Sequence, residues 1–287
     1  MTEPGAPPGP AVPGPALPGP ALLFCPGDRP DRFAKAADRS DTVVLDLEDA
    51  VAPDSKAAAR EAVAASGLDP GRTVVRVNAT EPDRALDLAA LAATSYRTVM
   101  VPKCSGPRDV AAVLEVLPDA RVCALVETAA GVLAASSVAA ADGVVALMWG
   151  AEDLVASLGG TSSRTPDGRY RDVARHARSV VLLAARAHGR AAVDAVHLDV
   201  DDVDGLEAEV RDAVASGFTA TACIHPSQVA VVRRAYRPDD AEVVWARDVL
   251  EAARSHGAEH GGVFRHDGRM VDGPVLRHAE EVLRRAR

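Results

Sequence analysis

The sequence contains few aromatic residues and no long apolar run. Phe, Trp and Tyr together make up 3% of the 287 residues, so the core has to be built mainly from Val, Leu and Ala. No stretch of about 18 consecutive apolar residues occurs, so no membrane-spanning helix is expected. The net charge is −9 and no basic tract is present, which disfavours nucleic acid binding as the main function.

Cysteine is also scarce. The four cysteines, Cys25, Cys104, Cys123 and Cys223, form no CxxC pair and lie in or beside apolar runs. We interpret them as small buried hydrophobic residues of a protein in a reducing compartment.

Residues 1–20 are the only low-complexity segment, and repeated Pro and Gly oppose both helix and sheet there. We therefore expect a disordered tail. The segment has no basic stretch followed by an unbroken apolar run, so it does not read as a secretory signal. A cytoplasmic location is the expectation that follows.

Short apolar runs rich in Val and Leu recur along the rest of the chain, separated by helix-like stretches rich in Ala, Leu, Arg and Glu. Nearly continuous apolar strands are typical of a parallel sheet buried on both faces. Eight such βα units predict a closed (β/α)8 TIM barrel over residues 21–235. A doubly wound open sheet is the alternative, and the absence of G-x-G-x-x-G after the first strand weakens it.

Residues 236–287 form an extension beyond the predicted barrel. The stretch "DDAEVVWARDVLEAARSHG" predicts a helix that ends at a glycine, and a short extended piece and a final amphipathic helix follow it. A barrel does not need this extension to close. We expect it to cover the barrel mouth as a lid or to dock on a neighbouring subunit.

Charged residues gather where the predicted strands end. The stretch "TVVLDLEDAV" at residues 42–51 even carries Asp46 inside an apolar run. Chemistry in such barrels lies at the carboxyl ends of the strands, so we interpret these residues as a ring of charges of both signs at the mouth. Its members include Glu48, Asp49, Arg76, Lys103, Glu127 and Asp153.

Glu127 and Asp153 are the most informative pair. They end consecutive predicted strands, so their backbones are expected about 5 Å apart. Two carboxylates this close repel each other unless a cation lies between them, and carboxylates without nearby His or Cys suit Mg2+. The alternative is a salt-bridged pair with Arg76 or Lys103 as the partner.

Two cationic features complete the predicted site. Arg76 lies two strands from Glu127, where a guanidinium can bind a carboxylate or stabilise an oxyanion. Arg29 and Lys35 belong to a small cationic cluster after the first strand, which suits a phosphate-bearing ligand. A solvated helix face is the alternative for that cluster.

Several motifs occur in order: LLFCPGDRPDRFAKA, VVLDLEDAV, VRVN, VPK, VETAAGV, WGAEDL, CIHPSQ and DGRMVDGPVL. Together they resemble the citrate lyase beta-subunit-like proteins of the HpcH/HpaI aldolase and malyl-CoA lyase superfamily, in their stand-alone form. The resemblance runs from residue 21 to the C-terminus. It implies a (β/α)8 barrel that assembles as a homotrimer or a hexamer, with Mg2+ and a CoA thioester as ligands.

The resemblance also implies roles for individual residues. Glu127 and Asp153 match metal ligands, and Arg76 matches an arginine that binds the substrate's carboxylate or carbonyl oxygen. Asp272, in "RMVDGP", matches a catalytic aspartate that reaches the site of a neighbouring subunit. The matches to CoA contacts are Phe24, Arg29 and Lys35, and the supporting residues are Glu48, Asp49 and Lys103.

The reaction implied is Mg2+-dependent cleavage of a carbon–carbon bond in a β-hydroxyacyl-CoA of the malyl-, citramalyl- or hydroxymethylglutaryl-CoA class. Its products are acetyl-CoA and a keto acid. A thioesterase or a malate-synthase-like enzyme using the same residues is the first alternative. The second is a subunit that is inert without citrate lyase partners, although the sequence reveals no such partner.

Overall fold

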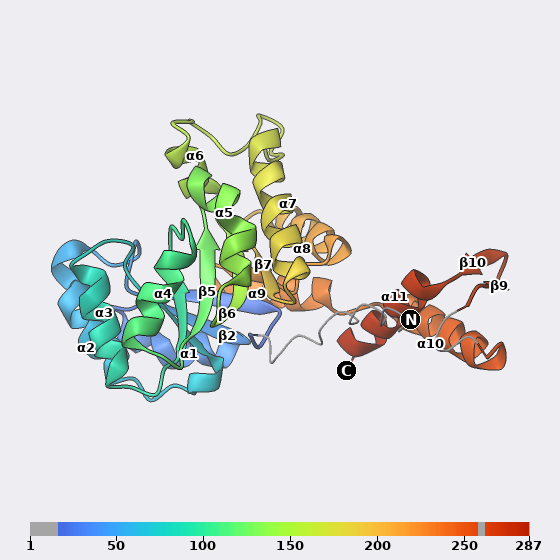
Figure 1. Ribbon diagram of the computed structural model, residues 1–287, viewed down its shortest axis with the longest axis horizontal. Helices are drawn as coiled ribbons and strands as arrows, with labels where there is room; N and C mark the ends of the chain where they lie inside the picture. Colours follow the sequence, from blue (N-terminus) through green and yellow to red (C-terminus); the bar gives the residue numbers. More distant parts are fainter. Residues whose placement is uncertain (1–16, 258–261, 287) are drawn as a thin grey trace, which may run out of the picture. The chain divides into compact units, whose positions relative to one another are not determined.

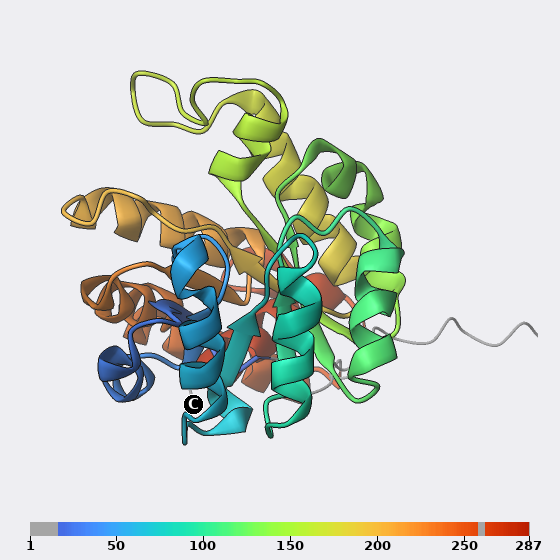
Figure 2. The same cartoon turned by 90° about the vertical axis from the view of Figure 1, so that its left-hand side faces the viewer.

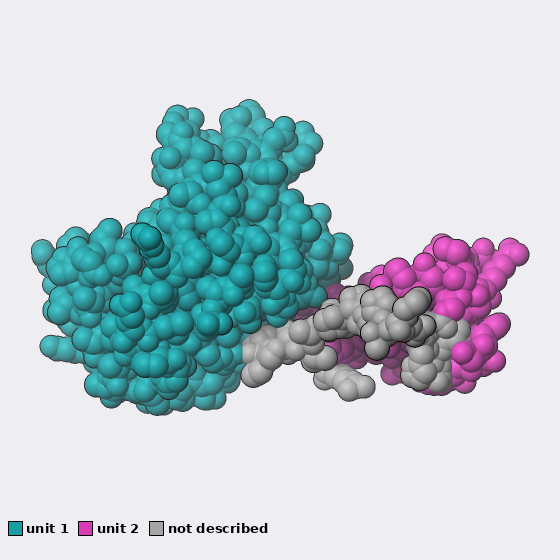
Figure 3. All heavy atoms as spheres, viewed as in Figure 1, with its two compact units in different colours: residues 1–232 teal, residues 233–287 magenta. Residues whose placement is uncertain are grey.

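The computed structural model describes residues 17–257 and 262–286, which divide into two compact units. The first unit extends to Val232 and the second begins at Arg233 (Figure 3). This division falls inside the same helix, α9 (Pro226–Tyr236), as the boundary expected from the sequence. Within the described ranges, no helix is both long and apolar enough to cross a bilayer.

The first unit is a closed barrel of eight parallel strands, which confirms the predicted TIM barrel (Figure 1). Each strand pairs with the next one along the chain, and β8 pairs with β1 to close the sheet. The strands are β1 (Ala21–Pro26), β2 (Thr42–Asp46), β3 (Thr73–Arg76), β4 (Thr98–Val101), β5 (Arg121–Val126), β6 (Val144–Trp149), β7 (Ala191–Asp194) and β8 (Ala220–Cys223).

Helices follow the strands and surround the barrel (Figure 2). Local signals set several of their ends: the Thr128 side chain caps α5 by accepting from the Gly131 amide, and Gly217 ends α8 with a left-handed backbone. The helices are α1 (Pro30–Arg39), α2 (Lys56–Ala64), α3 (Asp83–Ala92), α4 (Pro107–Val116), α5 (Ala129–Ala140), α6 (Ala151–Ser157), α7 (Asp172–Ala187) and α8 (Val203–Ser216), with 3-10 turns η1 (Pro53–Ser55) and η2 (Pro70–Arg72).

The barrel interior changes from apolar to charged towards the carboxyl ends of the strands. Successive residues of a strand point to opposite faces, so every second side chain enters the interior. The apolar cluster inside the barrel is therefore followed, two residues later on several strands, by polar or aromatic groups. The successive residues are Leu22 and Phe24 on β1, Val44 and Asp46 on β2, Val74 and Arg76 on β3, and Leu125 and Glu127 at β5.

The structure also corrects the amino-terminal prediction. Residues 1–16 of the predicted tail lie outside the described residues. The expectation of disorder is wrong for residues 17–20, because Leu17 packs in the apolar cluster of the barrel interior. The Pro20 carbonyl accepts a hydrogen bond of 2.9 Å from the Thr221 amide, which ties this segment to β8. The four cysteines are free and buried, as predicted.

The second unit contains the predicted succession of a helix, an extended piece and a final helix. Its elements are α10 (Asp240–Ser255), the antiparallel hairpin of β9 (Phe264–His266) and β10 (Arg269–Val271), and α11 (Gly273–Arg285). A capping box between Asp239 and Glu242 begins α10. The unit has its own apolar core, in which α10 packs on α11. Completion of a neighbouring subunit's site by this extension stays a prediction.

Candidate active site

Asp46 and Arg76 form the buried base of the barrel mouth. They are register partners on β2 and β3, and the Arg76 Nε and Nη2 atoms donate to the two Asp46 carboxylate oxygens at 2.7 and 2.6 Å. Asp46 also accepts from the backbone amides of Glu48 and Ala50, at 2.9 and 3.1 Å. Asp46 therefore fixes both Arg76 and the turn after β2, which explains a carboxylate inside an apolar strand.

Glu48 bridges two cations at the same end of the barrel. Its Oε2 atom lies 2.9 Å from Arg76 Nη1, and its Oε1 atom accepts from Lys103 Nζ at 2.7 Å. Burial raises the pKa of Glu48, and the positive charges of Arg76 and Lys103 counteract that rise without cancelling it. Asp49 is more exposed and lies farther away, 3.9 Å from Arg76 and 3.5 Å from Lys103.

Lys103 connects Glu48 to the pair predicted to bind metal. Its ammonium lies 3.5 Å from Asp153 Oδ1, and its backbone amide donates to Glu127 Oε1 at 3.0 Å. Its φ of 50° places a non-glycine residue in the left-handed region, which stores strain. Burial opposes its charge, but the hydrogen bond to Glu48 and the nearby carboxylates raise its pKa overall.

Glu127 and Asp153 come together at the ends of neighbouring strands. Glu127 directly follows β5 and is 3% exposed. Asp153, predicted to end the sixth strand, lies instead in the first turn of α6, because β6 ends at Trp149 and the helix begins at Ala151. Burial, with a smaller contribution from the charge of Asp153, raises the pKa of Glu127 to about 8. The alternative, a salt bridge to Lys103, is seen for Asp153, whose Oδ1 atom lies 3.5 Å from the Lys103 ammonium. Glu127 instead accepts from the Lys103 backbone amide.

The oxygen atoms of this pair fit a hard divalent cation. Glu127 and Asp153 offer carboxylate oxygens. A bound cation would offset the cost of burying the Glu127 carboxylate in its ionised form. Across the residues that the structure describes, no group of three or more His, Cys, Asp and Glu residues is arranged to hold a metal ion. Two carboxylates with remaining positions for water and ligand suit Mg2+ better than Zn2+.

Gly150 leaves room for the Glu127 side chain. A Cβ atom at this position would lie 2.6 Å from Glu127 Oε2 and 3.0 Å from Glu127 Cβ. Its φ of −126° suits any residue, so only space requires glycine here. We expect Gly150→Ala to displace the Glu127 carboxylate and to weaken Mg2+ binding about tenfold or more, by analogy with changes around metal ligands.

Isothermal titration calorimetry and a thermal melt of the metal-free protein check this prediction. Gly106→Ala is the matched control, because a Cβ atom there meets nothing within 4 Å and Gly106 also precedes a helix. Equal Mg2+ affinity in Gly150→Ala and the wild type would contradict the assigned position of Glu127.

The residues predicted to hold CoA lie in two different places. Phe24 is in the barrel interior, with the Arg76 guanidinium 5.1 Å from the centre of its ring. Arg29 directly precedes α1 and pairs with Asp31 at 2.9 Å, and Lys35 is exposed on the same helix. Phe24 therefore belongs to the base of the site, whereas the two cations belong to the surface.

Asp272 lies in the second unit. It precedes α11, and its side chain accepts from the Val275 amide at 3.4 Å. All other predicted site residues belong to the first unit.

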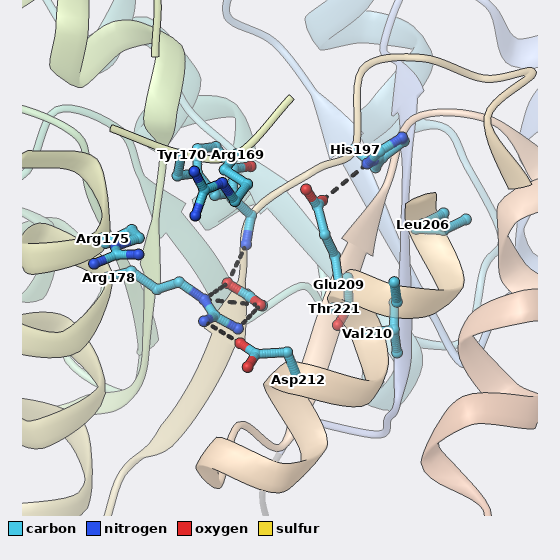
Figure 4. Close-up of a pocket in the computed structure, with 13 residues that line it drawn as sticks. Arg169, Tyr170, Arg175, Arg178, His197, Leu206, Glu209, Val210, Asp212 and Thr221 are labelled. Atoms are coloured by element: carbon cyan, nitrogen blue, oxygen red, sulfur yellow. Dashed lines mark hydrogen bonds and ion pairs between the residues drawn. The ribbon is translucent and has the colours of Figure 1, made fainter. Parts of the chain in front are cut away.

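A cavity of about 270 Å3 lies elsewhere, on the outer side of β7 between α7 and α8 (Figure 4). None of the predicted site residues lines it. Several of its charged groups pair with one another: Arg178 pairs with Asp194 at 2.7 Å and with Asp212 at 2.6 Å. His197 and Glu209 form a further pair at 2.8 Å, so we interpret the cluster as a structural network that links the outer helices to the barrel.

Comparison with known proteins agrees with this geometry. The family model for HpcH/HpaI aldolase/citrate lyase matches residues 21–226. The chain belongs to this family.

Other members of the HpcH/HpaI family are similar over nearly the whole chain. The citrate lyase subunit beta-like protein of Mycobacterium tuberculosis is 59% identical over 265 residues, which cover 92% of this chain and 94% of that protein. A (3S)-malyl-CoA thioesterase of Cereibacter sphaeroides is 35% identical over 272 residues, with 92% and 93% covered. The crystal structure of CitE from M. tuberculosis in complex with magnesium, acetoacetate and coenzyme A has a TM-score of 0.87 and 59% identity, covering 93% of this chain and 98% of that one.

Sequence reasoning missed the part that Asp46 and Lys56 play at the mouth. Asp46 could have been found, because it lies two residues after Val44 and therefore on the interior face of its strand. Lys56 carries no such signal, because its contacts depend on how α2 folds back onto the turn after β2.

Proposed function

We propose that this protein is a Mg2+-dependent carbon–carbon lyase acting on a β-hydroxyacyl-CoA of the malyl-, citramalyl- or hydroxymethylglutaryl-CoA class. The observation that carries the proposal is the buried Glu127 carboxylate, whose pKa is raised beside Asp153 at the barrel mouth. The M. tuberculosis relative crystallised with magnesium, acetoacetate and coenzyme A supports a cation, a keto acid and a CoA carrier as the ligands.

Glu127 and Asp153 would hold the ion. When bound, Mg2+ supplies a Lewis acid that withdraws electrons from the oxygens of the keto-acid half of the substrate. Lys103 keeps the Glu127 carboxylate aimed at the mouth through its backbone amide. Lys103 also has Glu48 as a partner at 2.7 Å, so Asp153 could serve as a ligand without leaving the ammonium unpaired.

Arg76 would orient the substrate and stabilise negative charge on its oxygen. Asp46 holds the guanidinium through two hydrogen bonds, so its direction is set before the ligand arrives. A guanidinium has five N–H groups, so donors remain for a ligand oxygen. Phe24 would form the floor beneath it, and Arg29 and Lys35 would contact the phosphates of CoA at the surface.

We further propose a homotrimer in which Asp272 of one chain completes the site of its neighbour. During cleavage, the hydroxyl gives its proton to water and becomes the keto oxygen. The bond between the carbinol carbon and the acetyl carbon breaks, its electron pair stays on the acetyl carbon, and that carbon gains a proton. Asp272 would be the acid that supplies this proton. The second unit is short and has its own apolar core, so it suits a lid that can dock on another copy.

Complementation tests the shared site. We expect Asp272→Asn and Arg76→Ala each to be inactive alone, because each removes a different member of the same site. Mixed and allowed to exchange subunits, they should recover a fraction of the wild-type turnover, since some sites then contain both intact residues. No recovery after exchange has been verified by native mass spectrometry would contradict the proposal.

A substrate panel tests the reaction. Purified protein with Mg2+ should convert one of malyl-, citramalyl- or hydroxymethylglutaryl-CoA into acetyl-CoA and a keto acid. Free CoA without acetyl-CoA would instead identify a thioesterase, the second candidate that the 35% identical malyl-CoA thioesterase favours. No turnover of any member would indicate a subunit that needs citrate lyase partners.

The pH dependence of Mg2+ binding follows from Glu127. The cation binds the ionised carboxylate, and in the metal-free protein that carboxyl has a pKa of about 8. Below that value binding must release a proton, so the affinity should rise about tenfold per pH unit up to about pH 8 and then level off. Calorimetry in buffers of different ionisation enthalpy measures the released proton.

Glu127→Gln provides the control for this pH dependence. It should remove both the proton release and most of the affinity. Because the folded-state pKa exceeds the ordinary value of 4.5, the folded protein binds the extra proton, and wild-type stability without metal should fall from about pH 5 to about pH 8. A Mg2+ affinity that is constant over this range would contradict the assignment.

A further inference from the structure

The turn that follows β2, residues 47–50, is held from outside the barrel by Lys56. This lysine is the first residue of α2, and its ammonium donates to the carbonyl oxygens of Leu47 and Glu48 at 2.9 and 3.0 Å. It also donates to the Asn78 side-chain oxygen. An ammonium has three N–H groups, so all of them are used within the protein.

Asn78 extends this contact into a buried chain of polar groups. Its Nδ2 atom donates to the same Leu47 carbonyl at 2.9 Å and to Asp87 Oδ2 at 2.7 Å. Asp87 is fully buried and pairs with Arg60 at 3.2 Å. Since every member has a fixed partner, the position of the Lys56 ammonium is determined by the outer wall of the barrel.

The same turn is held from the inside by Asp46, which accepts the amides of Glu48 and Ala50. The backbone of Glu48 is therefore fixed through both its amide and its carbonyl. Its carboxylate then lies between Arg76 and Lys103, and the Lys103 amide holds Glu127. A continuous set of contacts thus leads from Lys56 to the proposed metal ligand.

We propose that Lys56 is a positioning residue: it fixes the Glu48 carboxylate through the backbone and thereby sets the geometry of Lys103 and Glu127. The inference rests on the proposed function, because the site it positions is the proposed Mg2+ site. Lys56 would not touch the substrate. It acts as the outer support of a charged group inside the barrel mouth.

At the opposite end of β2, another cation also donates to backbone carbonyls, and none of these carbonyls belongs to a site residue. Arg72 donates to the carbonyls of Asp41, Ala37 and Ser40 at 3.0, 3.1 and 2.6 Å, directly before β2 begins. Arg72→Met and Lys56→Met therefore remove comparable cation–carbonyl contacts from the two ends of one strand. A purely structural role for Lys56 predicts similar consequences for both.

Calorimetry with Mg2+ distinguishes the two roles. We expect Lys56→Met to weaken Mg2+ binding about tenfold, the usual order for a change behind a metal ligand, and Arg72→Met to change it less than about twofold. In a Glu48→Gln background, Lys56→Met should add little, because its effect passes through Glu48. Lys56→Arg keeps the cation, so its Mg2+ affinity should lie between those of Lys56→Met and the wild type. It replaces Lys56→Met in this test if Lys56→Met does not fold.

Hydrogen exchange of the metal-free protein gives a readout that does not depend on metal binding. Lys56→Met should speed exchange of the Glu48 and Lys103 amides, and Arg72→Met should leave both unchanged. Wild-type protein that binds no Mg2+ would overturn the proposed function, and the exchange result would still decide the role of Lys56. Two results would overturn the positioning role. The first is an equal loss of Mg2+ affinity in Lys56→Met and Arg72→Met. The second is a double variant, Lys56→Met with Glu48→Gln, whose loss of affinity is the sum of the two single losses.

Discussion

Asp153→Asn is expected to lower Mg2+-dependent turnover roughly a thousandfold or more, since a Lewis acid contributes several kcal/mol to the transition state. The substitution keeps the shape of the side chain and removes the charge that would hold the ion. The Asp153 side chain is 38% exposed and its Lys103 contact of 3.5 Å is long, so the fold should tolerate the change. Turnover and Mg2+ affinity are measured together, with circular dichroism as the check on folding.

Asp172→Asn is the matched control for this variant. Asp172 also occupies the first turn of a helix, α7, but its side chain is 97% exposed and its partner, Arg175, is exposed as well. It should retain wild-type turnover and affinity. Full Mg2+-dependent activity in Asp153→Asn would show that the ion is held elsewhere, and the lyase mechanism would lose its basis.

Asp46→Ala should have the largest effect on stability, a loss of about 3–5 kcal/mol in the free energy of unfolding. The change leaves the Arg76 guanidinium, itself 9% exposed, without its bidentate partner. It also frees the amides of Glu48 and Ala50. Urea denaturation measures the loss. Adding Arg76→Met should recover part of it, because the buried guanidinium that lost its bidentate partner is then gone.

The exposed pair of Arg29 and Asp31 is the control. It has the same bidentate geometry, with both distances at 2.9 Å, but its side chains are largely in solvent. Solvent screens an exposed pair, so Asp31→Ala should barely change the unfolding curve. If Asp46→Ala were no more harmful than Asp31→Ala, burial would not be what makes the first pair important.

The sequence was sufficient for the barrel because its signals are local. Each strand is a short run of Val, Leu and Ala, and each is followed by a helical stretch, so the order of elements determines the closed parallel sheet. The same rhythm located Arg76, Lys103 and Glu127, because a charge inside an apolar strand is unexpected unless it enters the mouth.

Contacts between distant segments could not be predicted in this way. Asp46 was recognised as unusual, but its pairing with Arg76 depends on the register of β2 against β3. Lys56 looked like an ordinary helix residue until α2 placed its ammonium on the turn carbonyls. Leu17 follows a Pro- and Gly-rich stretch, and only the space at the bottom of the barrel explains its burial.

The left-handed backbone of Lys103 has a consequence for sequence divergence. A conformation of this kind disfavours side chains by about 1–2 kcal/mol, so glycine at this position would relieve backbone strain. The ammonium that pairs with Glu48 opposes drift towards glycine. Among descendants of this gene, glycine or asparagine at position 103 would therefore mark copies that have kept the barrel and abandoned its chemistry.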